Sequence, residues 1–221
     1  EAPSLTCPSN ISVGTDLDVC EAAIVVPAPA VSDECGILSV VNDFNNTNNA
    51  SGVYPIGTTT VTWTVTDIYN NVSTCSMTVT VTDDQDPYVT CPADQFVSAD
   101  NNCEFTMADY TALVIASDNC DLALDIVQSP AAGTIVAGTS TVTMTVTDDA
   151  GNVTTCTFSV IVEDNTAPTI VTCAPDVTEQ VNAGCDFSIP SYTGLVIATD
   201  NCDANLTYTQ SPVAGTVISD F

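Results

Sequence analysis

The chain has 221 residues, 28 of them acidic, and no lysine, arginine or histidine, so its formal net charge is −28 at pH 7. This composition excludes catalysis by an imidazole base, a Schiff-base lysine or an arginine clamp, so an enzyme is not predicted. It also disfavours nucleic acids and anionic membrane surfaces, which proteins bind mainly through Lys and Arg. The expected electrostatic partners are cations, among which Ca²⁺ suits clustered carboxylates best.

Eleven cysteines in an acidic chain rich in Thr and Val indicate an oxidising compartment, and so an extracellular or cell-surface protein. No stretch approaches the ~20 apolar residues that cross a bilayer, so membrane insertion is not expected. The cysteines recur in three groups, which are Cys7, Cys20, Cys35, Cys75, then Cys91, Cys103, Cys120, Cys156, then Cys173, Cys185, Cys202. A period of about 80 residues indicates an array of one module, each large enough to be a domain.

We expect two complete modules, residues 1–84 and 85–164, and a partial third module, residues 165–221. The third module lacks the counterpart of the last hairpin of the other two. An unpaired sheet edge is a template for further strands. Those strands come either from a continuation of the chain or from another copy of it, as in donor-strand complementation.

Residues 60–66 of the first module alternate strictly, with Val61, Trp63 and Val65 on one face and threonines on the other. Such alternation of β-branched residues is typical of a half-buried strand. Trp63 could stack on a sugar, but its phase with the two valines favours a place in the core. An exposed face of threonines could bind ice or carbohydrate, although Thr is also a common strand residue.

A turn at 67–71 follows, and then a second alternating strand at 75–81. The same strand, turn and strand recur at 141–162 in the second module. Short strands joined by turns, without helical periodicity, predict an all-β fold of tandem immunoglobulin-like β-sandwich modules stapled by disulfides.

The phase of the cysteines suggests how they pair, although four cysteines allow three connectivities. The second and fourth cysteines of a module share the inward face of their strands, so a bond across the core is expected. The first and third would then pair at one pole. The predicted bonds are Cys7–Cys35, Cys20–Cys75, Cys91–Cys120, Cys103–Cys156 and Cys173–Cys202, with Cys185 left without a partner.

Several motifs recur in order and resemble the hyalin repeat (HYR) domain, an immunoglobulin-like extracellular module. They are Thr-Cys-Pro at 6–8 and 90–92, Asp-Asn-Cys at 118–120 and 200–202, Gly-Thr-Thr-Thr-Val-Thr at 57–62, Thr-Asp-x-x-Gly-Asn-x-x-Thr-Cys at 147–156, and Val-x-Asp-x-x-x-Pro at 81–87 and 162–168. The first module departs from this pattern at Glu34 and at Asn70–Asn71. Residues 109–116 also look like long secreted repeat proteins of marine Bacteroidetes. The resemblance implies an adhesive or structural role and no catalysis.

Acidic residues gather in the linkers, the mid-module loops and the hairpin turns, which a sandwich of this topology brings together at each junction between modules. Carboxylate oxygens are ligands that Ca²⁺ prefers, and the linkers also look like those of cadherin junctions, where Ca²⁺ stiffens the array. The candidate ligands are Asp83, Asp86, Asp118 and Asp148 at the first junction, and Asp164 and Asp200 at the second. The alternative is that these are solvated turn residues, since Asp favours turns for local reasons.

Six Asn-x-Ser/Thr sequons are possible glycosylation sites, at Asn10, Asn45, Asn49, Asn71, Asn152 and Asn205. A chain rich in Asn and Thr also produces sequons by composition alone. The sequence as a whole predicts a segment of a long surface protein that acts as a stalk or filament stiffened by cations. Its partners would be neighbouring repeats or other copies of itself. The alternative is an adhesin module that binds glycans or a cell surface.

Overall fold

The computed structural model describes residues 1–219. Within them the chain is all-β, as predicted, apart from two short 3₁₀ helices, η1 (Thr111–Leu113) and η2 (Thr193–Leu195). Contacts divide the chain into two compact units. The first unit contains Glu1–Pro92, Tyr110–Ser129 and Thr143–Thr157, and the second contains Ala93–Asp109, Pro130–Val142 and the chain from Phe158 onwards.

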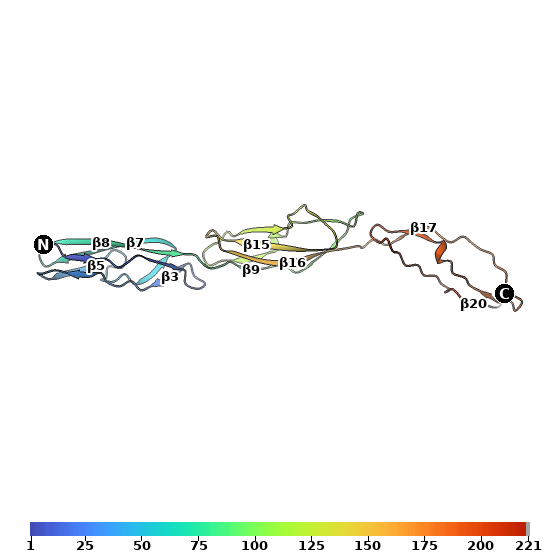
Figure 1. The fold of residues 1–221 in the computed structure, drawn as a ribbon, viewed down its shortest axis with the longest axis horizontal. Coiled ribbons are helices and arrows are strands. Elements are labelled where there is room, and N and C mark those ends of the chain that lie inside the picture. The colour runs from blue at the N-terminus through green and yellow to red at the C-terminus, as the bar shows by residue number, and fades with distance from the viewer. Residues whose placement is uncertain (220–221) are drawn as a thin grey trace. The chain divides into compact units, whose positions relative to one another are not determined.

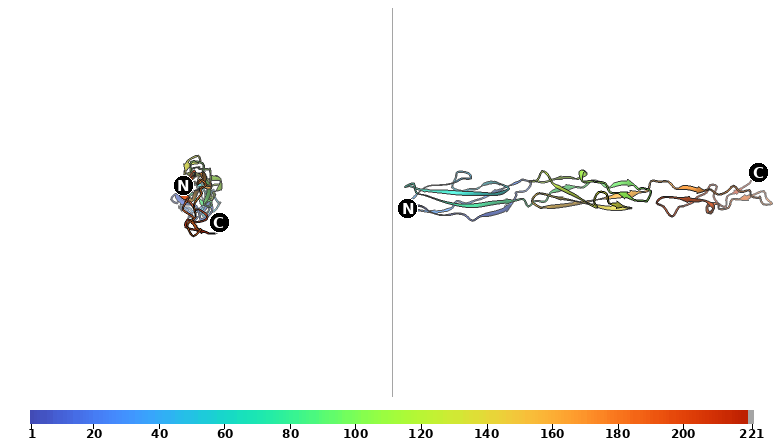
Figure 2. Two further views of the ribbon diagram at one scale, coloured as in Figure 1. Left: turned by 90° about the vertical axis from the view of Figure 1, so that its right-hand side faces the viewer. Right: turned by 90° about the horizontal axis from the view of Figure 1, so that it is seen from above.

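The first repeat is a sandwich of short and long strands. Its strands are β1 (Ser4–Thr6), β2 (Ile11–Gly14), β3 (Glu21–Ile24), β4 (Ala30–Ser32), β5 (Ile37–Asn42), β6 (Gly52–Pro55), β7 (Gly57–Asp67) and β8 (Val72–Thr82). One sheet has the order β2-β8-β7-β5, with β2 parallel to β8 and the other neighbours antiparallel. The pairs β1-β4 and β3-β6 form two smaller sheets. The long strands β7 and β8 lie side by side (Figure 1), and Figure 2 shows the first repeat from two further directions.

The second repeat has the same plan. Its strands are β9 (Tyr88–Thr90), β10 (Gln95–Ser98), β11 (Phe105–Thr106), β12 (Ile115–Ser117), β13 (Asp125–Ser129), β14 (Ile135–Val136), β15 (Thr139–Thr147) and β16 (Val153–Glu163). The sheet β10-β16-β15-β13 corresponds to the long sheet of the first repeat, and β12-β9 and β11-β14 are the smaller pairs.

The third repeat is represented by four short strands, β17 (Thr169–Thr172), β18 (Phe187–Ser188), β19 (Ile197–Thr199) and β20 (Val217–Ile218). They form the two small pairs β17-β19 and β18-β20. Among the described residues of this repeat there is no counterpart of the long sheet.

The core of the first repeat lies between its long sheet and the β3-β6 pair. Val61, Trp63 and Val65 are fully buried, and residues of β3, β6 and β8 join Trp63 in one apolar cluster. The Trp63 indole Nε1–H donates a hydrogen bond of 3.0 Å to the carbonyl of Asn48. The alternating pattern therefore forms the predicted strand, and Trp63 belongs to the core.

None of the four disulfides in the structure is a predicted pair. The bonds join Cys7 to Cys75, Cys20 to Cys120, Cys91 to Cys156 and Cys103 to Cys202, with Cα–Cα distances of 5.8, 4.8, 5.7 and 5.3 Å. Cys35, Cys173 and Cys185 are free and exposed. The predicted pairs Cys7–Cys35, Cys20–Cys75, Cys91–Cys120, Cys103–Cys156 and Cys173–Cys202 are therefore wrong.

The first error concerns the cysteine that follows the first strand of a repeat. Strand β1 contacts β8, and the Ser73 hydroxyl on β8 donates a hydrogen bond of 2.6 Å to the Pro3 carbonyl just before β1. Cys7, directly after β1, therefore lies beside Cys75 on the inward-facing side of β8. The bond that closes each complete repeat joins its first and fourth cysteines.

The second error concerns the second cysteine of a repeat. The phase argument placed Cys20 and Cys103 on strands, but β3 begins at Glu21 and β11 begins at Phe105. Both cysteines belong to the turns that precede these strands, and Cys103 has a positive φ of 65°. A turn residue is not bound by the two-residue period, so these side chains leave the core and reach the third cysteine of the next repeat.

We predict that Trp63→Ala lowers the free energy of unfolding by about 3–5 kcal/mol, because it removes the largest buried side chain of the first repeat and leaves a cavity. Denaturant unfolding followed by circular dichroism measures the change. Thr60→Ala, an exposed change on the same strand, is the matched control and should cost less than about 0.5 kcal/mol. Equal effects of the two changes would contradict the assignment of Trp63 to the core.

Candidate metal centre

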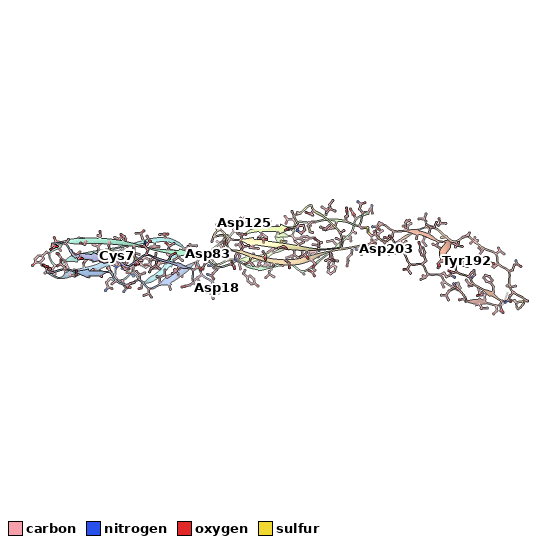
Figure 3. All side chains as sticks on the ribbon, viewed as in Figure 1. Cys7, Asp18, Asp83, Asp125, Tyr192 and Asp203 are labelled. Carbon is pink, nitrogen blue, oxygen red and sulfur yellow. A yellow bond between two sulfur atoms is a disulfide. The ribbon has the colours of Figure 1, made fainter. Side chains whose placement is uncertain are left out.

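Three aspartates from separate segments meet in the first compact unit. Asp83 follows β8, Asp118 follows β12 and Asp148 follows β15. One carboxylate oxygen from each lies within 4.8 Å of the other two. Figure 3 labels Asp83 where the long strands of the first repeat end. The structure thus brings together three of the four aspartates predicted for this junction.

Asp118 offers an oxygen that the protein itself does not use. Its Oδ1 accepts hydrogen bonds from the backbone N–H groups of Cys120 (2.8 Å) and Asp121 (2.9 Å). Its Oδ2 is buried and accepts no hydrogen bond. Burial of a carboxylate oxygen without a partner is costly, so this atom is the strongest local sign of an external cation.

Asp148 is held rigidly by its own turn. Its Oδ1 accepts from the N–H groups of Gly151 (2.6 Å) and Asn152 (2.7 Å), and its Oδ2 accepts from the Asn152 amide (2.7 Å). Burial of Asp148, a residue that is 6% exposed, acts to raise the pKa of its carboxyl. The hydrogen bonds from Asn152, Gly151 and Ala150 outweigh this, so the pKa of Asp148 lies below its usual value. The side chain is therefore a fixed anion at neutral pH.

The linker supplies the third carboxylate and fastens it. The Asp83 carbonyl accepts a bond of 3.4 Å from the Asn152 amide, and its Oδ1 accepts one of 3.3 Å from the N–H of Gln85. Gln85 in turn donates to the Asp16 carbonyl at 2.9 Å. Asp86 is exposed and is not a member of the three-carboxylate group.

The three carboxylates fit a calcium ion in spacing and chemistry. Two oxygens on opposite sides of a Ca²⁺ ion, each at about 2.4 Å, are about 4.8 Å apart, and the three oxygens lie within that span. The chain contains no cationic side chain that could neutralise them. Since Ca²⁺ takes 6–8 oxygens, backbone carbonyls and water would have to supply the rest.

The second compact unit repeats part of this arrangement. Asp200 Oδ1 accepts from the N–H groups of Cys202 (2.9 Å) and Asp203 (3.0 Å), and its Oδ2 is buried without a hydrogen-bond partner. The backbone N–H groups of Asp203 and Cys202 hold the pKa of Asp200 below its usual value. Asp200, one of the two aspartates predicted for the second junction, thus has an unpartnered buried oxygen like that of Asp118, whereas its pairing with Asp164 stays a prediction.

Sequence reasoning missed the amides that join consecutive repeats. The Asn119 amide donates to the Val19 carbonyl at 3.0 Å, and the Asn201 amide donates to the Asp100 carbonyl at 3.2 Å. Both asparagines directly precede the third cysteine of their repeat. The recurrence of the Asp-Asn-Cys motif is therefore the sequence feature that could have pointed to these contacts.

The predicted glycosylation sites differ in their surroundings. Asn10, Asn49 and Asn205 are exposed, whereas Asn45, Asn71 and Asn152 are half-buried. The amide nitrogens of the half-buried three donate hydrogen bonds, to the Ser51 carbonyl and to the carboxylates of Asp67 and Asp148. A glycan at these three positions would compete with those bonds, so the exposed three remain the better predictions.

The family model of the HYR domain matches residues 1–81 and again residues 82–162. The chain belongs to the HYR domain family. HYR domains form a non-enzymatic family, which agrees with the absence of cationic catalytic groups from the sequence. Together with the four disulfides, the family places the chain outside the cell or at its surface. Among residues 1–219 no helix is long and apolar enough to cross a membrane.

Two curated relatives are hyalins of sea urchins. Hyalin of Strongylocentrotus purpuratus is 28% identical over 99% of the chain, and hyalin of Lytechinus variegatus is 27% identical over 82% of it. The chain spans 19% and 35% of the length of these relatives. The expected resemblance to repeat proteins of marine Bacteroidetes is not supported by these matches.

Solved structures that the chain matches include cadherin fragments. Drosophila N-cadherin EC1-4 matches 74% of the chain and 50% of its own length, with 13% identity and a TM-score of 0.40. Human CDH23 EC21-23 matches 99% of the chain and 90% of its own length, with 15% identity and a TM-score of 0.40.

We predict that acid weakens the first repeat through Asp67, the counterpart of Asp148. The Asn71 amide, which donates to the Asp67 carboxylate at 2.7 Å, holds the pKa of Asp67 below its usual value despite 1% exposure of the residue. Asp67 therefore stabilises the fold above its unfolded pKa of about 4, and this contribution disappears as pH falls through the lower folded pKa.

Replacing Asn71 by Ala should bring the folded pKa of Asp67 closer to the unfolded one. The variant should be less stable at neutral pH and should lose less stability on acidification, as measured by melting temperature from about pH 7 to about pH 2. Asn48→Ala, an exposed change in the same repeat, is the control. If Asn71→Ala keeps the pH dependence of the parent, the hydrogen bond does not set this pKa.

Proposed function

We propose that the chain is a structural and adhesive segment of a longer extracellular repeat protein, with a calcium ion bound where one repeat follows the next. The observation that supports this most is the group of Asp83, Asp118 and Asp148, in which the buried Asp118 Oδ2 has no donor. A cation at this point would offset the mutual repulsion of three carboxylates that no side chain of the chain can neutralise.

The contacts around the three carboxylates suggest a mechanical role for the ion. The linker is already tied to the first repeat through Gln85 and to the second through Asn152, and the Cys20–Cys120 bond joins the two repeats covalently. An ion that takes ligands from the linker, a loop and a hairpin would restrict the remaining motion between the repeats. A stiffened array is suited to a stalk or filament, and its contacts would be with neighbouring repeats or with other copies.

We predict that Ca²⁺ raises the melting temperature of the protein after EDTA treatment and that Asp118→Asn abolishes most of the rise. The substitution keeps the Oδ1 acceptor of the loop and replaces the unpartnered Oδ2 by an amide, so it removes a ligand without removing the turn. Calcium at about 100 times its dissociation constant would contribute about 2.7 kcal/mol. Calorimetric titration and thermal melting measure the two effects.

Asp125→Asn is the matched control, because Asp125 is an exposed aspartate of the same repeat outside the group of three (Figure 3). It should leave calcium binding and melting unchanged. Small-angle scattering should show a narrower distribution of distances within the molecule with Ca²⁺ than with EDTA. If Ca²⁺ produces no heat of binding and no change in melting, the calcium proposal is wrong.

A further inference from the structure

The loop of residues 15–20, between β2 and β3, holds the linker that carries Asp83. The Gln85 side chain contacts this loop in three places. Its Oε1 accepts a hydrogen bond of 2.9 Å from the N–H of Asp18, and its Nε2 donates to the Thr15 hydroxyl at 2.7 Å and to the Asp16 carbonyl at 2.9 Å. Gln85 lies only two residues after Asp83, so the position of this candidate ligand depends on the 15–20 loop.

The same loop holds the segment that carries Asp118. Cys20, at the end of the loop, is bonded to Cys120, and the bond joins residues that are 100 positions apart in the sequence. The Asn119 amide adds a hydrogen bond of 3.0 Å to the Val19 carbonyl. The N–H of Cys120 donates to Asp118 Oδ1 at 2.8 Å. The disulfide therefore fastens the residue whose Oδ2 is buried without a partner.

The third ligand segment is connected to the other two by hydrogen bonds. The N–H of Asp149, directly after Asp148, donates to a carboxylate oxygen of Asp121 at 3.0 Å. The Asn152 amide of the same turn donates to the Asp83 carbonyl at 3.4 Å. The turn of Asp148 thus follows the segments of the other two aspartates, and the fixed relation between those two comes from the 15–20 loop.

We propose that the Cys20–Cys120 disulfide regulates the calcium site. Reduction of the bond lowers the affinity for Ca²⁺, and bound Ca²⁺ makes the bond harder to reduce. The regulation presupposes the calcium site proposed above. Of the four disulfides in residues 1–219, this one alone joins the 15–20 loop to a segment that carries one of the three aspartates.

The physical reason is preorganisation of the ligands. While the bond is intact, one loop fixes Asp83 and Asp118 relative to each other before an ion arrives, so little ordering is left for the binding step. After reduction, the segment of Asp118 is held to the loop by hydrogen bonds such as that of Asn119. The ion then has to order this segment itself, and the free energy of that ordering is subtracted from the free energy of binding.

The two effects are linked by thermodynamics. If reduction weakens calcium binding by a given factor, saturating Ca²⁺ lowers the equilibrium constant for reduction of the bond by the same factor. Coupling between two sites is typically 5–150-fold, and we expect about tenfold here.

The reductant is a low-molecular-weight thiol such as glutathione. Its thiolate attacks one sulfur of the bond, forms a mixed disulfide and releases one protein thiolate. A second glutathione thiolate attacks the glutathione sulfur of the mixed disulfide and releases the other. The protein gains two electrons and, on protonation, two protons, while two glutathione molecules become one molecule of oxidised glutathione. Cys20 and Cys120 are both half-buried, so the bond is partly accessible to such a thiol.

Calorimetric titration of the whole 221-residue chain with Ca²⁺ measures the first effect. Cys20→Ser combined with Cys120→Ser should raise the dissociation constant of the site about tenfold. Cys103→Ser combined with Cys202→Ser is the matched control, because it removes the other disulfide between consecutive repeats and leaves the loop of Asp118 intact. The control should keep the dissociation constant of the parent protein at the site that Asp118→Asn removes.

Redox titration of the parent protein measures the second effect and needs no cysteine variant. The protein is equilibrated with reduced and oxidised glutathione, with Ca²⁺ or with EDTA, and its free thiols are then alkylated. Peptide mapping gives the reduced fraction of each bond. Saturating Ca²⁺ should lower the equilibrium constant for reduction of Cys20–Cys120 about tenfold and leave that of Cys7–Cys75 unchanged. Asp118→Asn should abolish the difference.

The outcomes separate the regulation from the site itself. A parent protein that binds no Ca²⁺ overturns both. A parent protein that binds Ca²⁺, with the same equilibrium constant for reduction of Cys20–Cys120 in Ca²⁺ as in EDTA, has a calcium site that the disulfide does not regulate. The redox titration decides the matter even where the double serine variant fails to fold.

Discussion

No side chain of this chain carries a positive charge, so its carboxylates are stabilised mainly by hydrogen bonds or by ions from outside. In its turns the structure uses hydrogen bonds to stabilise the carboxylates. Backbone N–H groups and the amides of Asn71 and Asn152 surround Asp67 and Asp148, and both pKa values fall as a result. Asp118 Oδ2 and Asp200 Oδ2 are buried and accept no hydrogen bond, and at Asp118 the proposed cation would take the place of a donor.

Both the apolar core and a disulfide stabilise each complete repeat. The long β7-β8 hairpin of the first repeat buries alternating side chains around Trp63, and the bond from Cys7 to Cys75 fastens the first strand to that hairpin. A domain of this size gains a substantial part of its stability from such a bond. The second repeat uses the same bond between Cys91 and Cys156.

The joints between repeats use a different set of residues from the cores. A disulfide, an asparagine amide and, at the first joint, Gln85 connect loops that make no contribution to the alternating strands. The separation has a physical basis, since strand residues are committed to the core while loop residues are free to contact the next repeat. A repeat can therefore keep its fold while the residues of its joint change.

The sequence by itself determined the features that depend on local pattern. The period of the cysteines and the alternation around Trp63 predicted the repeats and their long strands. The clustering of acidic residues selected Asp83, Asp118 and Asp148, because loops at the same end of a sandwich must lie near one another.

Only the tertiary structure decided which cysteines meet. Cys20 shares the phase of the strand that follows it, but that strand begins one residue later, and a turn residue can direct its side chain away from the core. The distance between two sulfur atoms depends on where separate loops end in space. A period of two residues holds no information about that.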